Sequence, residues 1–125
     1  MPYTLEWAHG RRLVKATHFG DVTTEEIRDR ASDIERETGL AYRPCLLVDV
    51  RAITTYPSIA DLYFLAEANL YRPRVAERTA FVFNERTAES MDFILLAASN
   101  RGCSVQGFAE EDAAIDWLLS AAEAS

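Results

Sequence analysis

The stretch Cys45-Leu46-Leu47-Val48-Asp49-Val50, followed after seven residues by Ser58-Ile59-Ala60-Asp61-Leu62, decides the fold. An apolar run broken only by one acidic residue predicts a central strand over residues 45–50, buried on both faces. The second segment predicts a helix over residues 58–71 that begins at a serine. In open α/β sheets, ligands and partners bind beyond the carboxyl ends of the strands. A functional site is therefore expected near Ser58.

The composition describes a globular protein without the marks of a nucleic-acid or membrane binder. The chain has 125 residues, 49% of them hydrophobic, which fits one domain with a real core. Thirteen basic and twenty acidic residues give a net charge of −7, which opposes binding to nucleic acid or to anionic membranes. No apolar run approaches the roughly 20 residues that span a bilayer, and the first residues do not resemble a signal peptide. We expect a single cytoplasmic domain, residues 1–125, with no membrane insertion.

The first forty residues predict a hairpin and a helix. Residues 3–8 and 13–19 read as two strands around a turn that contains Gly10. Thr23 and a glutamate three residues later form a capping-box pattern, which opens a helix over residues 24–38. Gly39 stands where a left-handed residue ends such a helix.

The second half of the chain alternates strands and helices. Strands are predicted at 79–83 and 103–108, and helices at 87–100 and 110–122. The full order is ββαβαβαβα. Such alternation implies right-handed crossovers and mostly parallel pairing after the first strand. The predicted fold class is α/β, with a mixed, mostly parallel sheet packed with helices.

This order, together with several motifs, resembles the STAS domain of anti-sigma-factor antagonists and the broader group of small SpoIIAA-like bacterial proteins. The resemblance covers nearly the whole chain. It rests on the hairpin and on four segments, which are Leu46-Leu47-Val48-Asp49 leading to Ser58, Thr79-Ala80-Phe81-Val82-Phe83, Gly102-Cys103-Ser104-Val105-Gln106-Gly107-Phe108, and Ala113-x-x-x-Trp117-Leu118. It implies a STAS-like fold and a regulatory role in protein interaction.

The resemblance also implies a role for Ser58. In the antagonists the loop after the third strand reads Asp-Ser-Ser-Gly, and a partner kinase phosphorylates a serine there. Ser58 aligns with the first serine, whereas Pro57, Ile59 and Ala60 replace the other three residues. Two interpretations follow for Ser58, a phosphoacceptor and a helix cap that acts together with Asp61.

Aromatic and basic residues around the second helix suggest a binding face. Neighbouring residues on a helix point about 100° apart, so at most one of the aromatics at positions 63 and 64 can lie in the apolar stripe of this helix. Exposed aromatics are enriched at interfaces, although a second helix or a loop could also cover them. The predicted interaction surface comprises Tyr56, Tyr63, Phe64 and Tyr71. Arg72 and Arg74 form a small basic spot that could contact an anion.

The remaining polar residues give no catalytic pattern. Asp49 is expected to pair with Arg51 or Arg78, because no second carboxylate or nucleophile can be assigned beside it. Neither His9 nor His18 has a metal ligand at suitable spacing. Cys45 and Cys103 each begin an apolar run and are expected to be buried and reduced. No glycine-rich phosphate loop, metal set or cofactor fingerprint is present in the sequence.

We therefore expect a non-catalytic interaction or regulatory module, with its binding face around Ser58 and the helix 58–71. Its partner is another protein or a second copy of the chain. The alternative is a lipid or small-molecule carrier, because STAS-like chains resemble the Sec14-type fold in element order. That alternative requires an apolar pocket between the sheet and the second and third helices. An enzyme is the weakest hypothesis, and no cofactor is expected.

Overall fold

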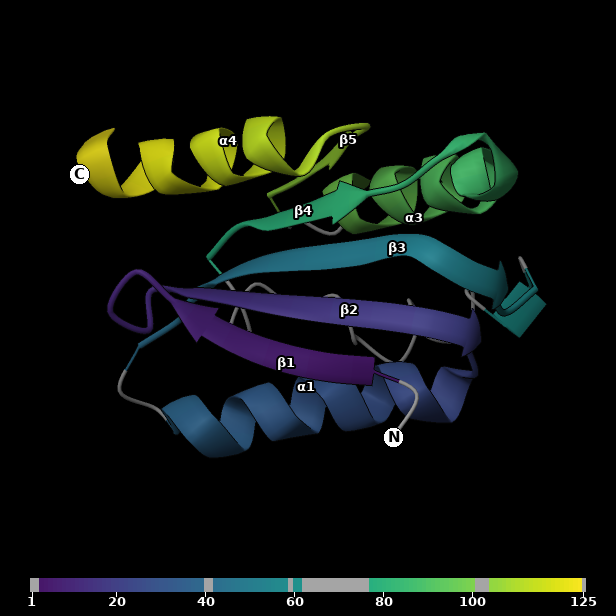
Figure 1. Cartoon of the computed structure of the whole chain (residues 1–125), viewed down its shortest axis with the longest axis horizontal. Coiled ribbons are helices and arrows are strands. Elements are labelled where there is room, and N and C mark those ends of the chain that lie inside the picture. The colour runs from purple at the N-terminus through teal and green to yellow at the C-terminus, as the bar shows by residue number, and fades with distance from the viewer. Residues whose placement is uncertain (1–2, 40–41, 59, 62–76, 101–103, 125) are drawn as a thin grey trace.

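A computed structural model describes residues 3–39, 42–58, 60–61, 77–100 and 104–124. These residues form a five-stranded sheet in the order β1-β2-β3-β4-β5, with helices packed on both faces (Figure 1). Strand β1 is antiparallel to β2, and all later neighbours are parallel. The predicted mixed, mostly parallel α/β sheet is confirmed.

The first two strands form the expected hairpin. Strand β1 (Tyr3–Ala8) pairs with β2 (Leu13–Asp21), which runs two residues further than predicted. The turn between them has three successive residues with positive φ, namely His9 at 52°, Gly10 at 65° and Arg11 at 66°. Two of these residues carry side chains in a backbone region that favours glycine.

Helix α1 (Thr24–Thr38) has the predicted bounds and the predicted caps. The Thr23 hydroxyl oxygen accepts a hydrogen bond of 3.2 Å from the backbone N–H of Glu26. Gly39, at φ 60°, ends the helix, and its N–H donates to the carbonyl of Glu35 at 2.8 Å. These bonds satisfy backbone groups that a helix terminus leaves unpaired.

Strand β3 corrects the expectation that the central strand ends near Val50. It spans Cys45–Thr55, because β2 continues to pair with it as far as the partners Asp21 and Thr55. Pairing with β4 stops earlier, at Asp49 and Val82. The last part of β3 therefore extends beyond β4, where the sequence predicted a loop.

The later elements match the predicted order with shifted ends. Strand β4 (Thr79–Val82) is followed by the short 3-10 helix η1 (Glu85–Thr87) and by α3 (Ala88–Asn100). Strand β5 (Val105–Phe108) leads to α4 (Glu111–Ala124). Helix α3 starts one residue late because Asn84 caps η1, its side-chain oxygen accepting from the N–H of Arg86. Cys103, the predicted start of the last strand, lies outside the described residues.

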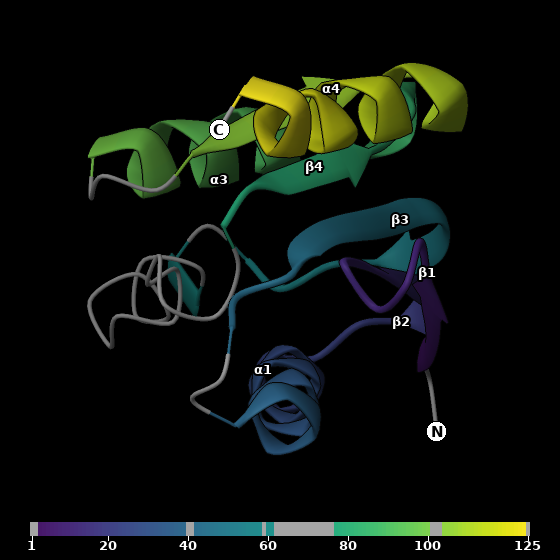
Figure 2. The ribbon, with the colours of Figure 1, turned by 90° about the vertical axis from the view of Figure 1, so that its left-hand side faces the viewer.

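Two apolar layers hold the sheet between the helices. Helices α1 and α3 lie on one side of the sheet and α4 on the other (Figure 2). The layer under α1 and α3 contains Val14, Ala16, Val22, Ile27, Ile34, Leu46, Val48, Val50, Ile53, Phe81, Met91 and Ile94. The layer under α4 contains Leu13, Cys45, Leu47, Ala80, Val82, Ala114 and Leu118. Strand β3 contributes to both layers, as a doubly buried strand should.

Candidate functional site at the carboxyl edge of the sheet

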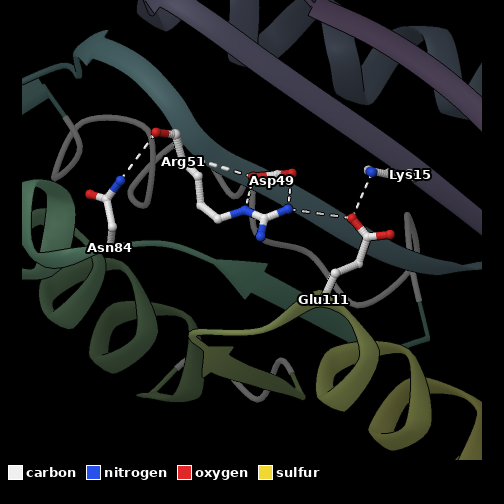
Figure 3. Close-up of polar contacts among 5 residues, drawn as sticks. All are labelled: Lys15, Asp49, Arg51, Asn84 and Glu111. Carbon is white, nitrogen blue, oxygen red and sulfur yellow. Dashed lines mark hydrogen bonds and ion pairs between the residues drawn. The ribbon is translucent and has the colours of Figure 1, made fainter.

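An ion pair within β3 anchors the polar residues at the carboxyl edge of the sheet. The Arg51 guanidinium donates to both carboxylate oxygens of Asp49, from Nε at 3.0 Å and from Nη2 at 2.8 Å (Figure 3). The backbone N–H of Arg51 also donates to the same carboxylate at 3.0 Å. The predicted structural pairing of Asp49 is thus confirmed, with Arg51 as its partner.

The other predicted partner of Asp49 lies elsewhere. Arg78 donates from Nη1 to the carbonyl of Trp117 at 2.9 Å, and its guanidinium carbon lies 4.7 Å from the centre of that indole ring. This cation–π contact ties the start of β4 to α4.

The first turn of α4 joins the ion pair to β2. Glu111 Oε1 lies 2.6 Å from Lys15 Nζ and 3.6 Å from Arg51 Nη2 (Figure 3). An acidic residue in a first helical turn is favoured by the helix dipole. A single carboxylate therefore connects two strands with the N-terminus of α4. We call Lys15, Asp49, Arg51 and Glu111 the edge network.

The segment after β4 is bound to the extended part of β3. Asn84 Nδ2 donates to the carbonyl of Arg51 at 3.1 Å (Figure 3). Arg86 Nη2 donates to the carbonyl of Ile53 at 3.1 Å. Since β4 has already ended here, these side chains satisfy carbonyls that no neighbouring strand reaches.

A pocket of about 350 Å³ opens beside this network. Its walls come from β3, from the segment between β4 and α3, from the first residue of α3 and from the residue after β5. The lining residues are Arg51, Phe83, Asn84, Glu85, Ala88 and Ala109. We call it the edge pocket. It lies at the carboxyl ends of parallel strands, where ligands bind in open α/β sheets. The predicted pocket between the sheet and the second and third helices involves residues 58–71, most of which lie outside the described residues.

The electrostatics of Asp49 do not suit acid–base catalysis. Burial alone would raise the pKa of its carboxyl, but hydrogen bonds and charge from Arg51, with Lys15 adding to them, lower the pKa overall. A general base needs a pKa near the working pH and a substrate within reach. The lowered pKa favours the ionised carboxylate, which both guanidinium donors of Arg51 contact. The edge network therefore fits a structural role.

Ser58 lies near this edge, three residues after the end of β3. Ser58 is exposed, and its hydroxyl oxygen accepts a hydrogen bond of 3.2 Å from the N–H of Asp61. This is the bond that the helix-cap interpretation predicts. Pro57 beside it is buried, and Tyr56 is half-buried with its side chain packed against the core layer of α1 and α3.

The other residues of the predicted binding face lie outside the described residues. These are Tyr63, Phe64 and Tyr71 of the aromatic set and Arg72 and Arg74 of the basic spot. Their roles remain predictions. Within the described part of the chain, no group of three or more histidine, cysteine, aspartate or glutamate side chains could hold a metal ion. No helix among the described residues is long and apolar enough to cross a membrane.

Cys45 is buried and free, as expected. Its Sγ donates to the carbonyl of Leu118 on α4 at 3.4 Å, and burial raises the pKa of the thiol. A thiol with a raised pKa is a poor nucleophile. Cys45 therefore packs in the apolar layer under α4 as a small hydrophobic residue.

A second charged cluster, which is buried, was not predicted from the sequence. His18 on β2 is 1% exposed, and its Nδ1 contacts a carboxylate oxygen of Glu26 on α1. Arg30 lies on the other side of the ring, with Nη1 3.1 Å from His18 Nε2. Tyr3 stacks on the imidazole at 5.4 Å between ring centres and donates to Asp33. The available signal was the i, i+4 spacing of Glu26 and Arg30 next to the apolar stripe of α1.

Burial determines the charge state of this cluster. Removal from water, and then the charge of Arg30, lower the pKa of His18 to about 3. Burial raises the pKa of Glu26. A neutral imidazole can donate from Nδ1 to Glu26 and accept at Nε2 from Arg30, which matches both contacts. His9, in contrast, lies exposed in the hairpin turn.

Comparison with known proteins identifies the fold. No family model matches the chain, and no curated protein matches its sequence. Its structure is similar to an uncharacterized DUF3478-family protein with a SpoIIAA-like fold from Shewanella loihica PV-4. That similarity has a TM-score of 0.64 and 16% identity, and it covers 93% of this chain and 91% of that one. It is also similar to an anti-sigma factor antagonist from Mycobacterium paratuberculosis, with a TM-score of 0.56, 15% identity and 93% of both chains covered. The chain has a SpoIIAA-like fold, as the sequence resemblance predicted.

Proposed function

We propose that the chain is a non-catalytic, cytoplasmic regulatory module that binds a protein partner through Ser58 and the segment 58–71. One observation carries this proposal. Strand β3 continues past the end of its pairing with β4 and brings the exposed Ser58 beyond the carboxyl edge of the sheet. A solved structure with a similar fold is an anti-sigma factor antagonist, a protein whose name describes action on another protein.

The polar residues of this edge support binding rather than chemistry. Asp49, Arg51, Glu111 and Lys15 are all engaged with one another. None of them is left as an activated base beside a nucleophile, which acyl or phosphoryl transfer would need. A rigid edge of this kind can hold a neighbouring binding segment in a fixed position.

The binding face proposed here combines a rigid and an aromatic part. Ser58 and Tyr56 follow directly from β3, and Tyr63, Phe64 and Tyr71 add large side chains of the kind that dominate interface energies. Arg72 and Arg74 supply positive charge for an acidic group of the partner. The partner is a different protein or a second copy of this chain.

Phosphorylation of Ser58 would change this face. A phosphate adds about −1.5 to −2 charges, which the amide groups of a helix start favour and the Asp61 carboxylate opposes. Its present role as a cap explains the serine by itself, since the hydroxyl holds the Asp61 N–H. Phosphorylation of Ser58 is the second interpretation, and it would replace this cap with a charged group on the proposed face.

A photo-crosslinking experiment tests the proposed face. A photoreactive phenylalanine analogue is placed at position 58, and in a matched variant at position 32, which is exposed on α1. After irradiation in cells, mass spectrometry identifies the crosslinked protein, and its affinity for the purified chain is then measured. We expect a crosslink from position 58 only. Equal crosslinking from both positions would contradict the proposed face.

The edge pocket favours one alternative, a small-ligand carrier. Its volume of about 350 Å³ is at the lower end of ligand-binding sites. Native mass spectrometry of the chain purified from cells tests this alternative directly. A co-purifying lipid or metabolite that is lost in Ala109→Trp would favour it, and a mass equal to the bare chain would count against it.

A further inference from the structure

The edge pocket has an apolar wall with a polar entrance. Phe83, Ala88 and Ala109 provide its apolar surface. The Phe83 ring lies against Gly107, where an added Cβ would come within 2.5 Å of Phe83 Cε1 and 3.0 Å of Leu95 Cδ1. Only a glycine allows the ring to lie this close to β5. The apolar wall thus depends on the close packing of Phe83, which follows β4, against Gly107 of β5.

Carboxylates dominate the surroundings of the pocket. Glu85 lines it, while Glu110 and Asp112 flank Glu111 beside Ala109. Glu85, Glu110 and Asp112 are exposed and form no ion pair within the described part of the chain. Glu85 therefore brings a negative charge into the lining of the pocket, and Glu110 interacts electrostatically with Arg51, which also lines it.

The nearby cations do not cancel this charge. Arg51 is neutralised by Asp49 and Glu111. Arg86 is turned toward β3, where its guanidinium donates to the carbonyls of Arg51 and Ile53. An anionic ligand would find these donors occupied and would face the free carboxylates, which cost energy through like-charge repulsion.

We propose that the edge pocket binds one large apolar side chain from a lysine- or arginine-rich segment of the protein partner. The apolar wall removes that side chain from water, and Glu85, Glu110 and Asp112 attract the flanking cations. Anchoring by one aromatic residue in a pocket with a charged rim is a common design of protein interfaces. This inference rests on the proposed function, because it adds a second contact for the same partner.

Strand β3 connects the pocket to the start of the proposed binding face. Arg51 lines the pocket from β3, and the same strand continues through Thr55 to Ser58. The bond from Arg86 to Ile53 fixes that stretch against the segment between β4 and α3. A partner segment seated in the pocket would therefore contact the same strand that leads to Ser58.

A synthetic peptide tests the inference without knowledge of the partner. The probe is a pentapeptide with tryptophan at its centre and lysine at the other four positions. Binding to the full chain is followed by NMR amide shifts. We expect shifts centred on Phe83, Ala88 and Ala109, and affinity that falls as salt shortens the Debye length from about 30 Å at 0.01 M to about 3 Å at 1 M. Shifts centred elsewhere would overturn the inference.

Variants and control peptides separate the contribution of the buried apolar side chain from that of the charge attraction. Ala109→Trp fills the pocket and should weaken binding at least ten-fold, whereas Ala8→Trp, at an exposed site on β1, should not. The triple change Glu85→Gln, Glu110→Gln and Asp112→Asn should weaken binding similarly. A peptide with alanine at its centre should bind at least ten-fold more weakly. Unchanged affinity in either the filled or the triple variant would contradict the proposal.

One further variant separates this inference from the proposed function. Ser58→Trp should leave the affinity for the pentapeptide unchanged, because Ser58 does not line the pocket. If the peptide binds as expected but crosslinks from position 58 are absent, the pocket stands and the Ser58 face fails. If the crosslinks from position 58 appear and the peptide does not bind at the pocket, the Ser58 face is supported and the pocket inference is wrong.

Discussion

Two charged clusters of similar composition differ in how far they are exposed to solvent. The cluster of His18, Glu26 and Arg30 lies between β2 and α1, and each member is at most 7% exposed. In the edge network, by contrast, the Arg51 side chain is 40% exposed and that of Glu111 is 30% exposed. Ion pairs removed from water are costly to break, whereas exposed pairs contribute little. Removing one member of the buried cluster should therefore cost more stability than removing one member of the edge network.

The strongest test of this contrast removes a charge from the buried cluster. Arg30→Met leaves Glu26 without a nearby guanidinium, and we expect the free energy of unfolding to fall by about 3–5 kcal/mol. Urea unfolding followed by circular dichroism measures this loss. Arg28→Met, at an exposed position of the same helix, is the matched control and should change little. Similar losses in the two variants would refute the contrast.

Acidification should weaken the fold through His18. Its pKa is about 3 in the folded chain, against 6.5 for the free imidazole, so the unfolded chain binds a proton that the folded chain refuses. The stability contributed above pH 6.5 is therefore lost progressively as the pH falls toward 3, by up to a few kcal/mol. Glu26 offsets part of this loss, because its raised pKa lets the folded chain take up a proton earlier.

Unfolding free energies measured across this pH range, for the parent chain and for His18→Phe, check the prediction. The variant lacks the imidazole, so its stability should depend less steeply on pH between about 6.5 and 4.5. Equal slopes in the two proteins would show that another group controls the acid response.

Breaking the edge network should cost less. Asp49→Asn removes the carboxylate that receives three hydrogen bonds from Arg51 and is only 9% exposed, so we expect a loss of about 1–3 kcal/mol in urea unfolding. A loss as large as that of Arg30→Met would mean that the edge is as important for stability as the buried cluster.

The outermost pair should matter least. Lys15 and Glu111 are each partly exposed, so Lys15→Met should change the free energy of unfolding by less than about 1 kcal/mol. The measurement is repeated at high salt, where the parent and variant should converge because screening weakens the pair. A difference that persists at high salt would point to lost packing of the lysine stem instead.

Local patterns in the sequence predicted most of the fold. The caps of α1 at Thr23 and Gly39, the order of the described elements and the doubly buried β3 were all readable, because capping and apolar periodicity are local properties. The predicted helix 58–71 lies mostly outside the described residues. The length of β3 was not. Its residues 51–55 alternate too weakly to mark a strand, and pairing with β2 alone extends it.

The site was only partly predictable, for a similar reason. The Asp49–Arg51 pair lies two residues apart and could be anticipated. The contact of Lys15 with Glu111 joins residues 96 positions apart, and the edge pocket gathers three distant segments. The packing of His18 against Glu26 and Arg30 depends on how α1 crosses β2, which no local pattern reveals.

The most direct test of the account measures partner affinity after a bulky change at the edge. The crosslinked partner is purified and titrated by calorimetry into the parent chain, Ser58→Trp and Ser32→Trp, the last being exposed on α1. The account predicts that Ser58→Trp weakens binding at least ten-fold, equivalent to about 1.4 kcal/mol, while Ser32→Trp binds like the parent. Unchanged affinity in Ser58→Trp, or an equal loss in Ser32→Trp, would contradict the assignment of binding to the carboxyl edge.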